Sequence, residues 1–236
     1  MKTDELEIIR RYSRRYGFNI RSTDTGPDDR ATPHCLAACI QEAASLDAIS
    51  LGFGADRLDD KGIVWILIRH SLRYTGRPCW RDDIVIDTWT NGVSGISALR
   101  DFYISSPDGS LVAKAATSWI IVDRNTKRPV RTSVLDAPDM EVFRYHSLGA
   151  EAVRIRPPEL SQGSLPVLEQ RVCASDIDRN GHVNNTRYIA WCEDALDALG
   201  EDACSIAGFD INYNSEALKG ETIELYCMKK ENEKTF

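Results

Sequence analysis

The stretch RATPHCLAACIQEAA, residues 30–44, carries the helix around which the fold is predicted to form. Thr32 suits the N-cap, because its hydroxyl can accept a hydrogen bond from a backbone N–H of the first turn, and Pro33 suits the first helical position. Gly52 is predicted to end the helix. Apolar side chains recur at i, i+3, i+4 and i+7 and form one face, on Leu36, Cys39, Ile40 and Ala43.

Four strand candidates follow this helix along the chain. The first, IVWILIRH, is almost entirely apolar, as expected for a strand that is buried on both faces. The third and fourth flank SPDG, a sequence typical of a tight turn. The pattern predicts an antiparallel sheet that covers the apolar face of the helix. The four segments span residues 63–70, 83–90, 97–105 and 111–123.

The same order of elements then recurs. A strand candidate at 167–175 is followed by a polar loop, a helix from Asn185 to Leu199 and further strands at 205–214 and 221–230. A shift of 151 residues lays GHVNNTRYIAWCEDA, residues 181–195, over the opening stretch, with Glu42 opposite Glu193. We therefore predict an α+β fold of two tandem units, each a long helix wrapped by a curved antiparallel sheet. The apolar face of the second helix is predicted to carry Tyr188, Cys192, Ala195, Leu196 and Leu199.

The segment from Ile155 to Pro166 is rich in Pro, Gly and Ser and is predicted to link the two units. The first domain then spans residues 1–154 and the second 167–236. The second unit looks short, so that its last strands are either missing from this sequence or supplied from elsewhere.

Composition excludes some classes of function. The 236 residues carry a formal net charge of −7, which argues against a nucleic-acid footprint. No apolar run approaches the length that a membrane-spanning helix needs. The seven cysteines show neither zinc-ribbon nor C-x-x-C spacing, which favours a reduced, cytoplasmic protein without a cofactor or metal. His34, Cys35 and Cys39 were weighed as metal ligands, but buried cysteines within one helix are the simpler interpretation.

A polar cluster precedes the second helix, in SDIDRNGHVNN, residues 175–185. A turn at Asn180-Gly181 and a helix cap at Asn184 or Asn185 explain every residue of it except His182. The alternative is catalysis, because N–H groups at a helix start can stabilise an oxyanion, His and Asn can polarise a carbonyl, and a carboxylate such as Asp178 can activate water. These groups suit the hydrolysis of an ester or thioester.

A second carboxylate is available in YNSEALKG, residues 213–220. Glu216 follows His182 by 34 residues and falls near the end of the strand after the helix. In a compact helix-on-sheet unit this strand can return Glu216 to the helix start. The alternative is an ordinary exposed glutamate at a strand end.

The stretch D-I-D-R-N-G-H-V-N-N-T-R-Y-I-A-W, residues 176–191, resembles the catalytic segment of the acyl-acyl carrier protein (acyl-ACP) thioesterases of plants and bacteria. Members of that family carry D-x-N-x-H-V-N-N before a helix and then a strand ending in Y-x-x-E-C. Asp178, Asn180 and His182 match the first pattern, and Tyr213 and Glu216 match the second. The segments at 78–92, 99–104 and 116–131 are also similar to the family's first domain. The resemblance implies a tandem hotdog fold.

The resemblance also implies roles for the site residues. Asp178 and Glu216 would handle the attacking water, and Asn180 and His182 would position the water and the thioester carbonyl. The substrate-binding residues would include Val183, Asn184 and Asn185.

One position departs from the family pattern. Ala217 stands where the family often has cysteine, so a Cys–His–Asn mechanism cannot run through it. Cys173 and Cys192 are other conceivable nucleophiles, although both fall in patterns typical of buried elements. The departure favours direct attack by water.

The first copy has Ala31, Thr32 and Pro33 where the 151-residue shift places His182, Val183 and Asn184, and we expect it to carry no chemistry. By resemblance, the first domain would hold the acyl chain and set its length. Trp65, Trp89 and Trp119 are candidates for lining that tunnel, with core packing as the alternative for each.

The implied function is hydrolysis of fatty acyl-ACP to free fatty acid, which would end chain elongation in fatty acid biosynthesis, a part of lipid metabolism. The alternatives are an acyl-CoA thioesterase on the same fold and a non-catalytic acyl-binding hotdog protein. Acyl carrier proteins are acidic, so docking would need a local basic patch. A monomer and a homodimer are both compatible with a tandem repeat. The candidates for the patch are Arg10, Arg11, Arg14 and Arg15, or Lys127, Arg128 and Arg131.

Overall fold

A computed structural model describes residues 2–135, 142–161, 163–230 and 233–235. The first half contains α1 (Lys2–Tyr12), β1 (Arg14–Asn19), α2 (Pro33–Ser50), α3 (Ala55–Asp60), β2 (Ile63–Tyr74), β3 (Asp83–Ser94), β4 (Ser97–Ser105), β5 (Leu111–Asp123) and β6 (Pro129–Val130). The second half contains β7 (Leu168–Arg171), α4 (Asn185–Ala198), β8 (Gly208–Asn212), β9 (Thr222–Leu225), β10 (Met228–Lys230) and β11 (Glu233–Thr235). The short 3₁₀ turns are Ser22–Asp24, Thr132–Leu135, Ala174–Asp176 and Ala203–Ser205.

The first long helix, α2, forms where the sequence predicts it. The Thr32 hydroxyl accepts a hydrogen bond from Cys35 N at 3.3 Å, and Pro33 is the first helical residue. The helix ends at its C-cap Leu51, and Gly52 follows with φ +82°, a conformation that glycine adopts without strain.

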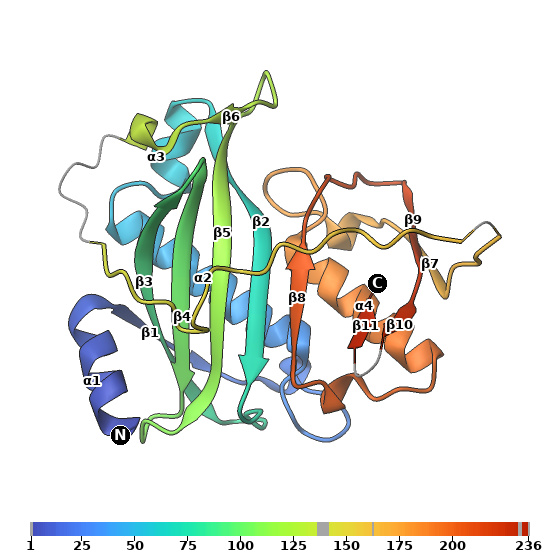
Figure 1. The fold of residues 1–236 in the computed structure, drawn as a ribbon, viewed down its shortest axis with the longest axis horizontal. Coiled ribbons are helices and arrows are strands. Elements are labelled where there is room, and N and C mark those ends of the chain that lie inside the picture. The colour runs from blue at the N-terminus through green and yellow to red at the C-terminus, as the bar shows by residue number, and fades with distance from the viewer. Residues whose placement is uncertain (1, 136–141, 162, 231–232, 236) are drawn as a thin grey trace.

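The sheet runs in the order β1-β3-β4-β5-β2-β8, with β6 paired to β5, and its strand pairs among the described residues are antiparallel. All four predicted strands are present, and β2 and β3 each extend four residues beyond the predicted end. Figure 1 shows α2 lying across one face of this sheet.

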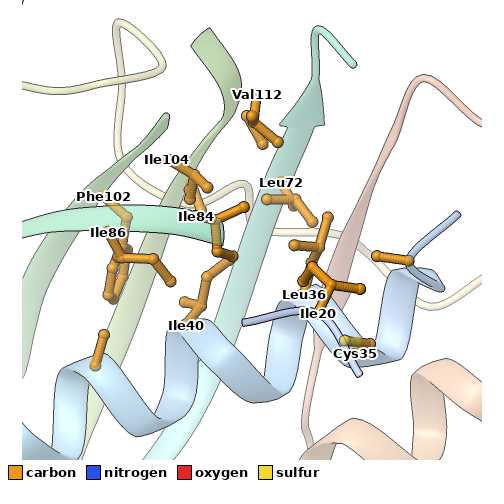
Figure 2. Packing of buried hydrophobic residues seen from close by; sticks show 14 of the residues in the cluster. Ile20, Cys35, Leu36, Ile40, Leu72, Ile84, Ile86, Phe102, Ile104 and Val112 are labelled. Atoms are coloured by element: carbon orange, nitrogen blue, oxygen red, sulfur yellow. The ribbon is translucent and has the colours of Figure 1, made fainter. Parts of the chain in front are cut away.

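The main core lies between α2 and the sheet. Leu36 and Ile40 from the helix meet Ile86 from β3 and Phe102 from β4, and each of these side chains is at most 1% exposed. Figure 2 shows these side chains converging in the space between helix and strands. Burying one such side chain stabilises the fold by roughly 1.5–3 kcal/mol, so this seam holds the first domain together.

The second helix, α4, buries a face that differs in part from the predicted one. Trp191 is 1% exposed and lies at the centre of the second core cluster, although the predicted face omits it. Leu199 was predicted to be buried and is 44% exposed, because it is the C-cap rather than part of the helix. Ala195 and Leu196 are buried as predicted.

The two halves share one sheet. Strand β8 of the second half pairs with β2 of the first, with Leu72 opposite Phe209, while the four-residue strands β7 and β9 pair with each other. Ile155 N, at the start of the predicted linker, donates to Asn212 Oδ1 at 3.0 Å. The second helix is therefore covered by a smaller sheet than the first, as its shorter sequence suggests.

The internal repeat is real in the backbone, but its register is 152 residues rather than the predicted 151. The loop before α2 and the loop before α4 are closed by the same backbone hydrogen bonds. Too few residues are identical between the two repeats for the sequence alone to fix the number of residues that separates them. The matching pairs are Gly26 N to Arg30 O with Asp178 N to His182 O, Asp29 N to Gly26 O with Gly181 N to Asp178 O, and Thr32 N to Asp24 O with Asn184 N to Asp176 O. The isolated bridges Thr25–Ala31 and Ile177–Val183 match as well.

The corrected register changes the pairing between the copies. Arg30, not Ala31, is the counterpart of His182, and the N-cap Thr32 is the counterpart of the N-cap Asn184. Asp29 even has φ +60°, the left-handed conformation that Gly181 adopts in the second copy.

Candidate active site

The loop before α4 is held in shape by a buried carboxylate. Asp176 is 3% exposed, and its side chain accepts hydrogen bonds from Cys173 N at 2.8 Å and from Arg187 Nε at 2.8 Å. Its carbonyl oxygen accepts a third bond from Asn184 N at 2.8 Å. These contacts tie the start of the loop to its end and to the first turn of α4.

Asp178, Asn180 and His182 share one tight turn. The Asp178 carboxylate accepts a hydrogen bond from Asn180 N at 2.8 Å, and Asp178 N donates to His182 O at 2.9 Å. Gly181 has φ +84°, which agrees with the turn predicted at Asn180-Gly181. The turn thus presents an acid, an amide and an imidazole from five consecutive residues.

Glu216 lies beside this turn, as the return of the chain after β8 was expected to allow. Its Oε2 is 3.3 Å from His182 Nε2. The backbone bond from Val183 N to Ala217 O, at 3.0 Å, holds the two segments side by side. The side chain of His182 is 15% exposed and that of Glu216 is 39% exposed, so solvent reaches the pair.

A lysine from the first domain also reaches this pair. Lys127 Nζ is 3.7 Å from the same Oε2 of Glu216. Both side chains are more than a third exposed, and such ion pairs are worth roughly 0–1 kcal/mol. The contact therefore places a positive charge near Glu216 rather than adding much stability.

The start of α4 is capped and anchored. Asn184 Oδ1 accepts a hydrogen bond from Thr186 N at 2.9 Å, which makes Asn184 the cap among the two predicted candidates. The Tyr213 hydroxyl donates to Asn185 O at 3.2 Å, and burial raises the pKa of Tyr213, so the phenol stays protonated and able to donate. Val183 is buried in the second core cluster, which fixes the backbone between His182 and the cap.

A cavity of about 830 Å³ opens against this turn. Asp178, Asn180 and Asn184 line one end of it, while His182 and Glu216 are not among its lining residues. Much of the remaining wall is apolar and comes from the first domain, on Ala44, Ala48, Phe53, Leu58, Leu99 and Leu135.

Charged side chains also reach the cavity wall. Arg100 is 6% exposed and forms a buried ion pair with Asp47 of α2. Arg179 lies in the turn of residues 178–182, which we call the catalytic-type turn. Its Nη2 donates a hydrogen bond to the Asp59 carboxylate of α3 at 2.7 Å, and Arg124 donates to the same carboxylate. Asp59 therefore links the turn to the first domain, a contact that nothing in the sequence indicates.

The three tryptophans that are candidates for the acyl tunnel do not lie together. Trp65 and Trp119 line the cavity, with their ring N–H groups bonded to Phe53 O at 3.1 Å and Thr117 Oγ1 at 2.8 Å. Trp89 does not line it. Its side chain packs on the opposite face of the sheet with Leu6 and Ile9 of α1. Side chains alternate along a strand, and Ile84 and Ile86 already face α2, so an odd-numbered residue of β3 points away from the cavity.

The cysteines weighed as nucleophiles lie outside this arrangement. Burial raises the pKa of Cys192 to about 12, which keeps it a thiol near neutral pH. Cys173 is exposed, and its thiol lies 3.5 Å from Arg171 O, at the far end of the loop. His34, weighed as a metal ligand, bonds Glu193 of α4 through Nδ1 at 2.8 Å.

The arrangement suits hydrolysis of an acyl compound. A carboxylate, an amide and an imidazole converge near a helix start, where backbone N–H groups favour negative charge. A second carboxylate supports the imidazole, and the neighbouring cavity has room and apolar surface for an acyl chain.

Comparison with known proteins identifies the fold first. The chain superposes on the acyl-ACP thioesterase of Bacteroides thetaiotaomicron with a TM-score of 0.77, 21% identity, and coverage of 95% of this chain and 90% of that one. For the 12:0-ACP thioesterase from Umbellularia californica the TM-score is 0.69 and the identity 23%, with coverage of 89% and 85%. The fold is therefore a tandem hotdog fold, as expected.

The family follows from the sequence. Residues 11–136 match the family model of the acyl-ACP thioesterase N-terminal domain, and residues 163–236 match that of the C-terminal domain. The chain belongs to the acyl-ACP thioesterase family.

Two curated relatives have names that specify acyl groups. The chain is 25% identical to oleoyl-acyl carrier protein thioesterase 1, chloroplastic, of Arabidopsis thaliana, over 88% of this chain and 61% of that protein. It is 25% identical to palmitoyl-acyl carrier protein thioesterase, chloroplastic, of Gossypium hirsutum, over 84% of this chain and 51% of that protein. The chain thus spans between half and two thirds of the length of these relatives.

Proposed function

We propose that this protein hydrolyses the thioester of a fatty acyl-ACP and releases the free fatty acid, which ends chain elongation in fatty acid biosynthesis. The observation that carries the proposal is the turn with Asp178, Asn180 and His182, with Glu216 beside it, at the end of a largely apolar cavity of about 830 Å³. Membership of the acyl-ACP thioesterase family supports the same conclusion.

The proposed reaction proceeds by direct attack of water. Asp178 and Glu216 orient the water and accept its proton, while Asn180 and His182 position the water and the thioester carbonyl. The water oxygen bonds to the carbonyl carbon and the carbonyl electron pair moves onto oxygen. Collapse of this intermediate breaks the C–S bond, and the leaving thiolate takes up a proton. The raised pKa of Cys192 and the presence of Ala217 after Glu216 support water rather than sulfur as the nucleophile.

The division of labour follows the two halves of the chain. In this proposal residues 1–154 hold the acyl chain, 155–166 link the domains, and 167–236 supply the catalytic groups. Trp65, Trp119 and Asn184 line the cavity and remain candidates for contacting the chain. In this proposal Val183, buried in the second core, and Asn185 act through the backbone of the helix start.

For docking an acidic carrier protein, we favour the turn after β5. It carries Lys127, Arg128 and Arg131, and Lys127 already reaches the site. Three of the four arginines near the start pair with other side chains, Arg10 and Arg15 with Asp87 and Arg14 with Asp47.

The proposal extends to the compartment and to the oligomeric state. Cys35, Cys39, Cys79, Cys173 and Cys192 form no disulfide, which supports the cytoplasm as the compartment, although the two plant relatives are named chloroplastic. Within the described ranges, no helix is both long enough and apolar enough to cross a membrane. Strand β8 already pairs with the edge of β2, which supports a monomer as the active unit.

The test compares acyl-ACP and acyl-CoA thioesters across chain lengths for the wild type, Asp178→Asn and Glu216→Gln. We expect faster turnover with the carrier-protein substrates and at least a hundredfold loss in kcat for both variants. Equal turnover of acyl-CoA would favour the acyl-CoA thioesterase alternative. Binding of acyl groups without hydrolysis would favour the non-catalytic one, and a trapped acyl-enzyme would exclude direct water attack.

A further inference from the structure

The N-terminus of α2 is occupied by a side chain from α4. The carboxylate of Glu193 accepts a hydrogen bond from His34 N at 2.7 Å and lies 2.8 Å from His34 Nδ1. His34 is the second residue of α2, whose first N–H groups have no partner within the helix. A carboxylate in this place satisfies such a donor and is favoured by the helix dipole.

The repeat predicts which residue takes the corresponding place at α4. Glu193 lies nine residues after the N-cap Asn184, and the residue nine positions after the N-cap Thr32 is Gln41. The 152-residue register gives the same pairing, since 193 − 152 = 41. Gln41 of α2 is therefore the counterpart of Glu193 of α4, and the two helices contact each other.

The surroundings of Gln41 agree with that position. Gln41 lines the cavity together with Asp178, Asn180 and Asn184, the residues of the catalytic-type turn and of the α4 cap. Its Oε1 is buried and has no hydrogen-bond partner in the described parts of the chain. Its Nε2 is not among the buried unpaired atoms of the described residues, and the side chain that carries it lines the cavity.

We propose that Gln41 is a further catalytic residue, contributed by the first domain, whose amide NH₂ donates a hydrogen bond to the thioester carbonyl oxygen at the start of α4. This role rests on the proposed thioesterase function. The neutral amide matters because the oxygen gains negative charge when water adds to the carbonyl carbon. A donor stabilises that charge, whereas a carboxylate in the same place would repel it.

The asymmetry between the two helix starts gives the role a physical reason. At α2, Glu193 occupies the N–H group of His34, so no ligand oxygen can bind there. At α4, an amide of nearly the same shape carries no charge. Gln41 therefore leaves the helix start open for the substrate.

The decisive variant is Gln41→Glu, which recreates at α4 the arrangement seen at α2. We expect kcat for acyl-ACP to fall about a hundredfold, as when an oxyanion donor is lost, while KM and the midpoint of thermal unfolding stay near the wild-type values. The ratio of variant to wild-type kcat should rise as the pH falls from 8 to 5, because protonation neutralises the new carboxylate. Gln41→Met should lose roughly tenfold to a hundredfold with no such pH dependence.

The matched control is Glu193→Gln, which changes the same pair of residue types at the inactive helix start and should leave kcat within about twofold. Gln41→Glu and Gln41→Met variants that both keep wild-type kcat would overturn the role of Gln41. The role would also be overturned if kcat fell together with the midpoint of thermal unfolding and the loss of kcat in Gln41→Glu did not depend on pH. Those results would mean that Gln41 contributes only to packing.

A binding measurement separates this role from the proposed function. An acyl-pantetheine ketone, in which CH₂ replaces the thioester sulfur, keeps the carbonyl but cannot be hydrolysed. Calorimetry should show about tenfold weaker binding of this ketone to Gln41→Met than to the wild type. Equal affinities would overturn the role even in an active enzyme, whereas a wild type that binds the ketone but cleaves no thioester would defeat only the proposed function.

Discussion

The loops that precede α2 and α4 have the same backbone and different side chains. Both close with the same hydrogen bonds, and both place a residue in the left-handed conformation, Asp29 in one and Gly181 in the other. The counterparts of Asp178, Asn180 and His182 are Gly26, Asp28 and Arg30. The comparison shows that the loop shape needs only backbone groups and one aspartate, Asp24 or Asp176, whose carboxylate accepts a hydrogen bond from the N–H three residues earlier. The remaining side chains are free to carry chemistry or not.

The two helix starts also differ in what lies against them. The start of α2 meets the carboxylate of Glu193, and the start of α4 meets a cavity that Gln41 lines. One repeat thus uses its helix start to fasten the two halves together. The other exposes it beside the acyl-sized cavity.

The largest expected effect comes from removing the imidazole that distinguishes the second loop. His182→Ala should lower kcat at least a hundredfold, because a positioned histidine contributes about 10²–10⁴-fold to such reactions. The matched variant in the first loop, Arg30→Ala, should leave kcat within about twofold. Steady-state kinetics on acyl-ACP checks both, and equal losses would show that the first loop is not inert.

A second prediction concerns the strands that join the copies. His70 of β2 is 2% exposed, faces the ring of Phe209 at 5.2 Å and lies opposite Ile211 of β8. Burial lowers the pKa of His70 to about 4, despite the opposing charge of Asp210. The unfolded chain, with a pKa near 6.5, binds the proton first, so stability is full above pH 6.5 and falls as the pH drops towards 4.

The loss assigned to His70 over that window is about 3 kcal/mol. His70→Phe should remove it, and keeps an aromatic ring against Phe209. Urea unfolding at pH 7.5, 6 and 5 measures the difference, with the wild type correcting for the carboxylates that also titrate. If the free energy of unfolding changed with pH equally in the wild type and in His70→Phe, His70 would not be buried as a neutral imidazole.

A smaller effect is expected where Glu193 meets α2. Glu193→Gln should lower the free energy of unfolding by about 1–2 kcal/mol, because a charged hydrogen bond at a helix start is replaced by a neutral one. Activity should remain, because the start of α2 is not part of the candidate active site. Chemical denaturation measures the first effect and kinetics the second. A large loss of kcat without loss of stability would reverse the assignment of the two helix starts.

The smallest effect is expected at the contact between the domains. Lys127→Met should lower kcat about twofold to threefold on both acyl-ACP and acyl-CoA, because the exposed Lys127–Glu216 pair contributes little. Raising the salt concentration should reduce the difference in kcat between the wild type and Lys127→Met, because salt screens the ion pair. Arg57→Met, which removes an exposed positive charge of α3 outside the proposed docking segment, is the control for general charge. An effect confined to KM for acyl-ACP would assign Lys127 to docking alone.

Much of the local structure was predictable from the sequence. Thr32 and Pro33 start α2, and the apolar runs predict β2, β3, β4 and β5, because capping and side-chain periodicity are short-range properties. The turn at Asn180-Gly181 follows from the same rules. The candidate residues of that turn could be named early, since a lone histidine is the one feature that turn chemistry does not explain.

Contacts between distant segments were less predictable. Trp191 forms the centre of the second core with Val172, Val183 and Leu225, segments that lie far from it in the chain, and the list of residues on the predicted face omits it although it lies three residues after Tyr188. Trp89 is a candidate for the acyl tunnel or for core packing by sequence, and strand alternation turns it under α1, into the core. The predicted shift between the two repeats was one residue too short, because too few residues are identical to fix it, whereas the backbone hydrogen bonds of the two loops fix it.

Short-range features of the sequence were enough to predict which segments become helices, strands and turns and to name the acid, amide and imidazole of the candidate site. Those outcomes depend on neighbours within a few residues. Only the tertiary structure decided that Glu216 meets His182, that Lys127 and Asp59 reach the second domain's loop, and that Gln41 lines the cavity beside the cap of α4. These depend on how two helices and a shared sheet pack, and packing joins residues whose separation in the chain carries no local signal.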